Sequence, residues 1–227
     1  MCMKLICKLA IALLSALAIA NANAVIINFQ DMAKTDGTAY GESIWNTLTI
    51  TDPSFTLNIT GTNSAGPAYA YLDSISGGYA AGLGVCGTPT DINKINTKYP
   101  NSGTNLCNPS DDDNVTTGEA LHFTFNTNVI IDTIWFNDNH DSDFNLNGNQ
   151  IVIGGSNYLF SNGGVHQDSY TLSPYNVSAS HTFDIAFYDD QFYISKIDVR
   201  AVPEPATLAL MGIGLIGLGF SRRKRTH

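Results

Sequence analysis

Apolar and polar residues alternate along much of the chain between its two ends. In the stretch LHFTF, Leu121, Phe123 and Phe125 fall on one face and the two polar residues fall on the other. The same period of two recurs in WNTLTITD, SFTLNIT, VIIDTIWF, NQIVIGG, HTFDIAFYD and, with a slip near Ser195, QFYISKIDV. Because successive side chains of a strand point to opposite faces, this pattern predicts short strands, and the slip predicts a bulge.

Turn residues separate these predicted strands. Gly, Asn and Pro lie between them, and WNTLTITD and SFTLNIT are expected to pair around Asp52-Pro53. No stretch outside the two ends has a convincing helical period, so we predict an all-β protein whose body is an antiparallel β-sandwich or jelly roll. Residues 61–118 differ, because they are rich in Gly and Asn and carry few strand signals. They predict a long loop that other contacts must hold against the body.

The first 24 residues have the features of a secretory signal peptide. Two lysines precede the apolar segment 9–20, and Ala22 and Ala24 then form a cleavage site of the A-x-A type. The alternative, a buried N-terminal helix, does not explain this order of charge, apolar segment and small residues. We therefore expect export through the Sec translocon and cleavage by signal peptidase, with the mature chain beginning near Val25.

A second apolar segment, residues 206–220, lies near the C-terminus. As a helix it would reach roughly 22 Å at about 1.5 Å per residue, which is short for a hydrocarbon core of about 30 Å. A basic cluster follows that can reach the membrane interface and predicts that this end stays cytoplasmic. The cluster consists of Arg222, Arg223, Lys224 and Arg225. The segment is predicted to be a single transmembrane helix, and one alternative is that it anchors the protein permanently.

The C-terminal segment combines three elements in order: Val-Pro-Glu-Pro, the short Gly-rich apolar span, and the basic cluster. This combination resembles the PEP-CTERM sorting domain, which exosortases of Gram-negative bacteria recognise, and Pro203, Glu204 and Pro205 match its signature tripeptide. The two prolines keep that segment extended. The resemblance implies a transient inner-membrane anchor that an exosortase cuts near the motif, after which the body reaches the cell surface or the extracellular space.

Three parts of the chain are thus expected. They are a signal peptide (1–24), a secreted β-sandwich domain (25–201) and a sorting signal (202–227). The run from GLGVCG through CNPSDDDNVTTGEALHFTF to IWFNDNHD is also similar to a body type that recurs with such tails. That similarity implies a β-sandwich exported with the surface matrix and no established activity.

The body is strongly acidic. Residues 25–202 contain five Lys and Arg residues against 19 Asp and Glu residues, a net charge of −14. Such a charge disfavours nucleic acid as a partner and suits a secreted protein that binds cations.

Two cysteines remain after signal-peptide removal. Cys86 and Cys107 are an isolated pair in a chain expected to enter an oxidising compartment, which predicts a disulfide worth about 3 kcal/mol. A zinc site is the alternative, but no CxxC motif or histidine cluster accompanies them.

Acidic residues gather in SDDDNVTTGEALHF and in FNDNHDSDFNLNGNQ. Crowded carboxylates are the hard oxygen ligands that Ca²⁺ prefers, so a bound calcium ion is a hypothesis for these segments. The candidate ligands are Asp111, Asp112, Asp113, Glu119, Asp138, Asp141 and Asp143. The alternative is that both clusters are solvated turns.

No pattern in the chain predicts catalysis. The histidines are scattered, and G-x-S-x-G is absent from the sequence. We therefore expect a noncatalytic matrix or surface protein associated with exopolysaccharide or biofilm. The alternative is a carbohydrate-binding module in which exposed tyrosines stack on sugars. The candidates are Tyr69, Tyr71, Tyr79 and Tyr99.

Overall fold

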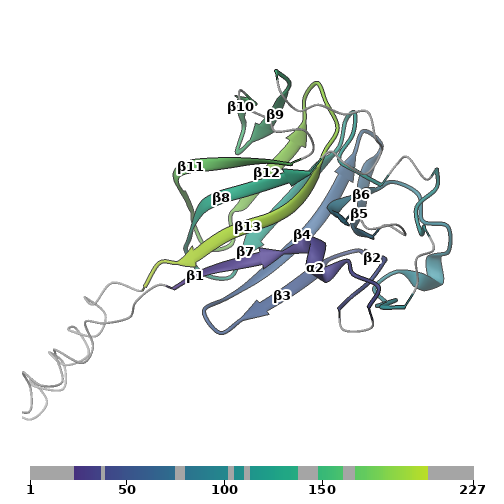
Figure 1. Cartoon of the computed structure of the whole chain (residues 1–227). Coiled ribbons are helices and arrows are strands. Elements are labelled where there is room, and N and C mark those ends of the chain that lie inside the picture. Colours follow the sequence, from purple (N-terminus) through teal and green to yellow (C-terminus); the bar gives the residue numbers. More distant parts are fainter. Residues whose placement is uncertain are drawn as a thin grey trace, which may run out of the picture. The chain divides into compact units, whose positions relative to one another are not determined.

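The computed structural model describes residues 23–36, 39–74, 80–101, 105–109, 113–137, 148–160 and 167–203. Within these ranges the chain is mostly antiparallel β-strand (Figure 1). Residues Ala24–Ala201 form one compact unit. Most of the expected signal peptide and the apolar segment 206–220 lie outside the described residues. In the described part of the chain, no helix has the length and apolar character needed to cross a bilayer.

The described part of the chain contains strands and two single-turn helices, and a long segment joins β6 to β7. The first six strands are β1 (Ala24–Asn28), β2 (Ser43–Trp45), β3 (Leu48–Asp52), β4 (Phe55–Asn63), β5 (Gly66–Ser74) and β6 (Ala80–Cys86). The others are β7 (Ala120–Phe125), β8 (Val129–Asn137), β9 (Gln150–Ile153), β10 (Ser156–Leu159), β11 (Gln167–Val177), β12 (Thr182–Phe187) and β13 (Tyr193–Ala201). The helices are α2 (Phe29–Met32) and the 3-10 turn η1 (Ile92–Lys94).

All these strands belong to one curled sheet. Its order is β10-β9-β12-β7-β4-β5-β6-β13-β8-β11, with β1 added to β13, β2 to β5 and β3 to β4. Strand β5 forms the corner, because its first residues pair with β4 and its later residues pair with β6 and β2. The prediction of an antiparallel all-β body is confirmed, and the structure shows one continuous curled sheet.

The two halves of the curled sheet share one hydrophobic core. The alternating residues of LHFTF are all fully buried, as their period of two predicted. Phe123 of β7 packs edge-on against Phe183 of β12, while Phe136 of β8 packs edge-on against Phe160 and Phe192. All five rings belong to the same buried cluster. Each buried Phe contributes about 1.5–3 kcal/mol through removal from water, so this core holds the curl closed.

Two local predictions are confirmed. Strands β3 and β4 form a hairpin in which Asp52 pairs with Phe55, and the side chain of Asp52 accepts a 2.8 Å hydrogen bond from the Ser54 backbone. In β13 the register with β8 shifts between Ile194 and Lys196, so a bulge lies at Ser195. A bulge moves the alternation by one residue, which explains the slip seen in QFYISKIDV.

The prediction of a long loop over residues 61–118 is wrong. Strands β5 and β6 occupy much of it, and consecutive residues of both strands are buried. Their inner face packs on the main core and their outer face is covered by the segment that follows β6. A strand covered on both faces has no polar alternation, so its sequence of Ala, Gly, Leu and Tyr carries no period-two signal.

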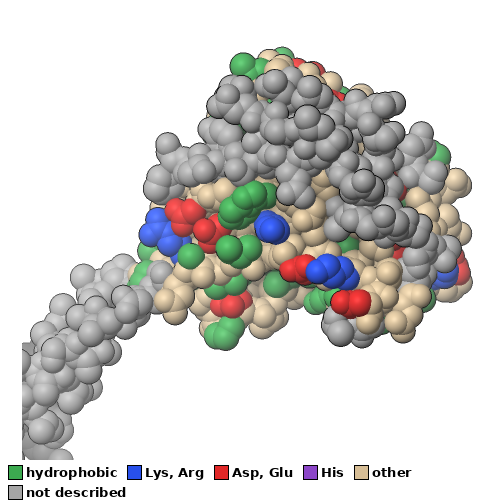
Figure 2. Space-filling model, in the orientation of Figure 1, with side chains coloured by type: hydrophobic (Ala, Val, Ile, Leu, Met, Phe, Trp, Pro, Cys, Tyr) green, Lys and Arg blue, Asp and Glu red, His purple; other side chains and the backbone are tan. Residues whose placement is uncertain are grey.

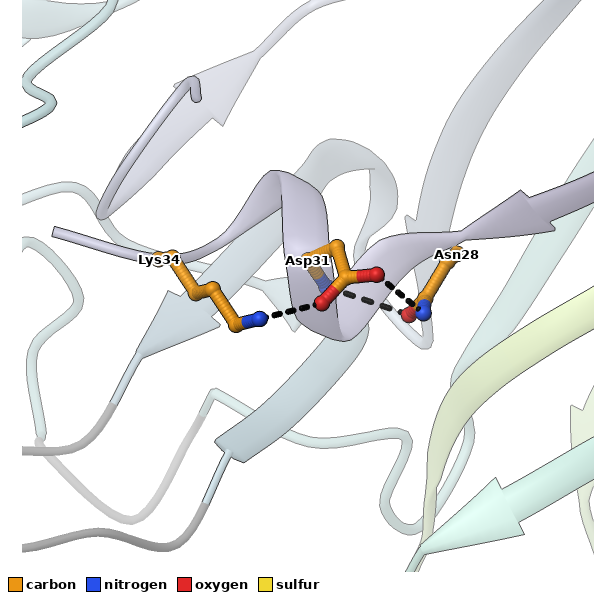
Figure 3. A network of polar contacts seen from close by, with 3 residues as sticks. All are labelled: Asn28, Asp31 and Lys34. Atoms are coloured by element: carbon orange, nitrogen blue, oxygen red, sulfur yellow. Dashed lines mark hydrogen bonds and ion pairs between the residues drawn. The ribbon is translucent and has the colours of Figure 1, made fainter. Parts of the chain in front are cut away.

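Helix α2 turns the chain away from β1. Asn28 caps it, because the Asn28 Oδ1 atom accepts a 3.1 Å hydrogen bond from the Asp31 backbone N–H (Figure 3). Lys34 Nζ lies 2.5 Å from Asp31 Oδ1 in an exposed ion pair, which contributes little because water screens it. Phe29, fully buried, is the residue that fixes this turn to the core.

Candidate functional site

Three carboxylates are buried where the segment that follows β6 packs on the rest of the body. Glu42 lies just before β2, Asp73 lies in β5, and Asp113 lies in the segment between β6 and β7. Their exposed fractions are 1%, 2% and 0%. Acidic side chains are almost never this buried without partners, so their hydrogen bonds decide what this cluster can do.

We call Glu42, Asp73, Asp113 and their hydrogen-bond partners the acid network. Two tyrosines and a backbone amide donate hydrogen bonds to Glu42 and Asp113. Tyr71 donates its hydroxyl proton to Glu42, and the Ser74 N–H donates to Glu42 Oε2 at 2.9 Å. Tyr193 of β13 donates to Asp113 Oδ1 at 2.5 Å. The network therefore connects β5 and β13 with the segments that precede β2 and β7.

Burial sets the protonation of Glu42. The pKa of Glu42 is raised to about 10, chiefly by loss of hydration and next by the neighbouring carboxylate of Asp73. The charge of Asp113 also raises this pKa, whereas the hydrogen bond from the Ser74 N–H lowers it. Glu42 therefore keeps its proton at neutral pH, because ionising it would place another negative charge in a water-poor cluster.

A disulfide lies beside the network. Cys86 and Cys107 are bonded, with their Cα atoms 5.7 Å apart, which confirms the predicted pair. Both cysteines pack with Tyr71, Leu106 and Ile44 in a second buried cluster. The backbone N–H of Leu106 donates to the hydroxyl oxygen of Tyr71 at 3.2 Å. The disulfide thus fixes the covering segment over the acid network.

The candidate calcium ligands are only partly described. Asp111, Asp112, Asp138, Asp141 and Asp143 lie outside the described residues. Asp113 does not lie in a solvated turn, and Glu119, 4% exposed, accepts a 3.0 Å hydrogen bond from the Thr116 backbone. In the part of the chain that the structure describes, no three His, Cys, Asp or Glu side chains form a group that could hold a metal ion.

A second polar constellation lies on the outer face of the sheet. His122 Nε2 and Thr62 Oγ1 form a 2.7 Å hydrogen bond, and His122 Nδ1 lies 2.7 Å from Asp184 Oδ1. Thr62, His122 and Asp184 come from the neighbouring strands β4, β7 and β12. Sequence reasoning missed this group, because the three residues are far apart along the chain and only strand register brings them together.

Hydroxyl and amide side chains surround this histidine. On β3, β4, β7 and β12 the outward positions alternate with buried ones and carry mostly Thr or Asn. We call this surface the outer threonine face; it comprises Thr49, Thr51, Thr56, Asn58, Thr60, Thr62, His122, Thr124, Thr182 and Asp184. With strands about 4.8 Å apart, it presents hydrogen-bond donors and acceptors in rows and contains the close contact of His122 with Asp184.

The tyrosines expected to stack on sugars lie elsewhere. Tyr71 is fully buried in the acid network, so its prediction as an exposed platform is wrong; the covering segment over β5 is the cause. Tyr69 and Tyr99 are half-buried against the disulfide cluster, and Lys94 Nζ lies 5.5 Å from the centre of the Tyr99 ring. Tyr79 lies outside the described residues.

The two ends of the body are adjacent. Strand β1 begins at Ala24, which pairs with Arg200 near the end of β13. Asp132 of β8 accepts hydrogen bonds from two nitrogens of Arg200, at 2.7 and 3.1 Å. This pair joins β8 to the end of β13. Among the residues coloured in Figure 2, the Lys and Arg side chains on the displayed face lie apart from one another. Beyond Ala201 the chain leaves the sheet, and Pro203 is exposed.

Residues 201–224, which begin at the last residue of β13, match the family described as the PEP-CTERM protein-sorting motif. The chain carries a PEP-CTERM sorting motif. The resemblance seen in the sequence is therefore confirmed. Comparisons with curated proteins and with solved structures found no match.

A PEP-CTERM motif implies an exosortase as processing partner and export to the cell surface by way of a transient C-terminal anchor. Of the signature tripeptide, Pro203 is described, whereas Glu204, Pro205 and the basic cluster at 222–225 lie outside the described residues. The PEP-CTERM motif thus starts where the folded body ends.

Proposed function

We propose that this protein is a noncatalytic component of the extracellular matrix or cell surface, delivered with exopolysaccharide or biofilm material. The observation that carries the proposal is the PEP-CTERM motif directly after β13. The body, which we propose to be a β-sandwich of the jelly-roll type, supplies a compact unit that the disulfide stabilises outside the cell.

The experiment that tests this proposal is intact-mass analysis of the protein from the cell surface and medium. We expect loss of the N-terminal segment near Ala24 and of the C-terminal segment near residues 203–205. The matched control is the same strain without its exosortase, in which the C-terminal segment should remain attached. An exported protein that keeps residues 222–225 in the presence of the exosortase would contradict the proposal.

Carbohydrate binding is the second candidate function, and the outer threonine face favours it. Rows of hydroxyl and amide groups can exchange hydrogen bonds with sugar hydroxyls, and the Thr62–His122–Asp184 group holds its donors and acceptors in place. Binding to a glycan array and to the isolated exopolysaccharide of the producing cells tests it. Thr124→Val should weaken binding, whereas Thr133→Val, on the other half of the sheet, should not. Equal binding by both variants would exclude the face.

We also propose that Ca²⁺ stabilises the body. The support is the density of carboxylates in residues 111–119 and 138–143 of a body whose net charge is −14. At a calcium concentration 100 times its dissociation constant, the ion would add about 2.7 kcal/mol, a rise in melting temperature of roughly 5–10 °C. Mg²⁺ should do less, because it dehydrates reluctantly. Equal shifts with both ions would show charge screening and no specific site.

A further inference from the structure

The two tryptophans of the chain have different surroundings. Trp45 of β2 packs edge-on against Tyr40, with ring centres 5.6 Å apart, and donates its indole N–H to Ser43 Oγ at 3.0 Å. Trp135 of β8 is half-buried and packs with neither of the two buried clusters. No hydrogen bond or ring contact among the described residues involves it. Trp135 therefore keeps an aromatic surface and a hydrogen-bond donor that the described body does not use.

Strand register places Lys196 of β13 beside Trp135. The two residues are cross-strand partners, so their Cβ atoms are about 5 Å apart on the same side of the sheet. The bulge at Ser195 causes this pairing, because in an unbroken ladder Ser195 would lie opposite Trp135. The bulge thus replaces a short hydroxyl side chain next to the indole with a long ammonium side chain.

Lys196 differs from the other basic residues of the body, which number five in all. The other four each contact an acid or an aromatic ring: Lys34 with Asp31, Arg200 with Asp132, Lys94 with Tyr99 and Lys98 with Tyr40. Lys196 makes no such contact with any described residue, although the body contains 19 acids. Its ammonium group and the Trp135 N–H are therefore two neighbouring donors that a ligand can use.

The outward side chains around this pair carry no net charge. We call the surface the Trp135 face; it comprises Ile26, Asp132, Trp135, Lys196, Asp198 and Arg200. Two basic residues against two acids give 2 − 2 = 0, in a body whose net charge is −14. Ile26 is 58% exposed and pairs with Asp198, so the face also has an apolar margin. Figure 2 shows hydrophobic side chains beside single basic and acidic ones over β1 and β13.

We infer that the Trp135 face binds the sugar rings of an uncharged polysaccharide. This inference rests on the carbohydrate binding proposed above as the second function, and it names another surface and the class of glycan. A sugar ring can pack its apolar face on the indole, which offers a large rigid contact area. Its hydroxyl groups both donate and accept, so they can accept from Lys196 and Trp135 and donate to the Asp198 carboxylate.

Charge separates an uncharged glycan from a carboxylated one. A polymer of uronic acids would find no net positive charge on the Trp135 face, and the body around it would repel the polymer. An uncharged polymer has no such cost. Over residues 196–200 the three strands β1, β13 and β8 form a surface about 10 Å wide and about 13 Å long, which leaves room for more than one sugar ring.

The outer threonine face offers different contacts. Its named members include no aromatic residue, and several of its polar groups satisfy one another: Thr49 Oγ1 donates to Asn58 Oδ1 at 2.8 Å, and His122 bonds to Thr62. A sugar bound there would have to compete with these hydrogen bonds. The two surfaces lie on different strands, so single substitutions can tell which of them holds the glycan.

The test is affinity electrophoresis of the protein recovered from the cell surface and medium of the producing cells. Native gels contain dextran, mannan or soluble β-glucan as uncharged probes, or alginate as the carboxylated probe. The variants are Trp135→Ala and Lys196→Gln, and the matched controls are Trp45→Phe and Thr124→Val. In a second measurement, Trp45→Phe leaves Trp135 as the only indole, and acrylamide quenching reports whether an uncharged probe covers it.

We expect at least one uncharged polymer to retard the natural protein and both controls. Trp135→Ala should weaken this binding at least about tenfold, and Lys196→Gln about threefold. The melting temperature of both should stay close to that of the natural protein, because neither side chain belongs to a buried cluster. In Trp45→Phe, the retarding polymer should protect Trp135 from acrylamide.

Three results would overturn the inference. Loss of binding in Thr124→Val with unchanged binding in Trp135→Ala would place the glycan on the outer threonine face and leave carbohydrate binding itself intact. Stronger retardation by alginate than by every uncharged polymer would refute the class of glycan. If none of the four polymers retards the natural protein, carbohydrate binding fails and this inference fails with it.

Discussion

Replacing Glu42 with Gln should remove a pH dependence from the stability of the body. Glu42 has a pKa of about 10 in the folded protein against an ordinary value of 4.5, so the folded state holds a proton that the unfolded state releases. A group whose pKa is raised by folding stabilises fully below its unfolded pKa, and this stabilisation is lost as pH rises toward the folded pKa. Between pH 5 and 8, Glu42 should therefore make the protein progressively less stable.

The size of the effect follows from the proton count. One proton bound by the folded state alone changes the free energy of unfolding by about 1.4 kcal/mol per pH unit, or about 4 kcal/mol between pH 5 and 8. Relaxation and entry of water lower the cost of a buried charge, so we expect about 2 kcal/mol. At pH 5 the variant should match the natural protein, because Gln can accept from the Ser74 N–H and donate to the Tyr71 hydroxyl oxygen.

Urea unfolding of the mature protein and of Glu42→Gln at pH 5, 6, 7 and 8 measures this difference. The buffers contain EDTA, so that no divalent cation contributes to the measured stability. Asp31→Asn is the matched control, since it removes one negative charge from an exposed side chain. If the difference between Glu42→Gln and the natural protein changes by less than about 0.5 kcal/mol across this range, the buried neutral carboxyl is refuted.

Three other predictions concern stability. Replacing both disulfide cysteines with Ser should lower the free energy of unfolding by about 3 kcal/mol, because their 21-residue separation closes a loop in the unfolded chain; an unchanged urea midpoint would contradict this. Gly84→Ala should lower the free energy of unfolding by about 3 kcal/mol, because the added Cβ would collide with the Asp113 carbonyl oxygen. Gly155→Ala, whose Cβ meets open space at a φ of +81°, should lower it by about 1 kcal/mol. A double-mutant cycle on Asp132 and Arg200 should give a coupling of about 1 kcal/mol that falls with added salt; a salt-independent coupling would argue against a half-buried ion pair that solvent ions can screen.

The strands with one buried face could be predicted because the residue types within each strand follow the burial of its two faces. In β4, β7 and β12, buried and outward residues alternate, and the chain shows that alternation directly. The PEP-CTERM motif was readable for a similar reason, since sorting enzymes act on a linear segment whose order of residues is the signal. The disulfide was predictable because the body contains a single pair of cysteines.

The sequence by itself thus determined the all-β class, the sorting motif and the cysteine pair. Only the tertiary structure decided that Asp113 is buried with Glu42, and that His122 lies between Thr62 and Asp184. Each of these contacts joins residues that lie in different segments of the chain, and strand register together with the covering segment sets which of them meet. The sequence alone suggested solvated acids and scattered histidines. The surroundings of these side chains come from segments distant in sequence, so no local pattern predicts them.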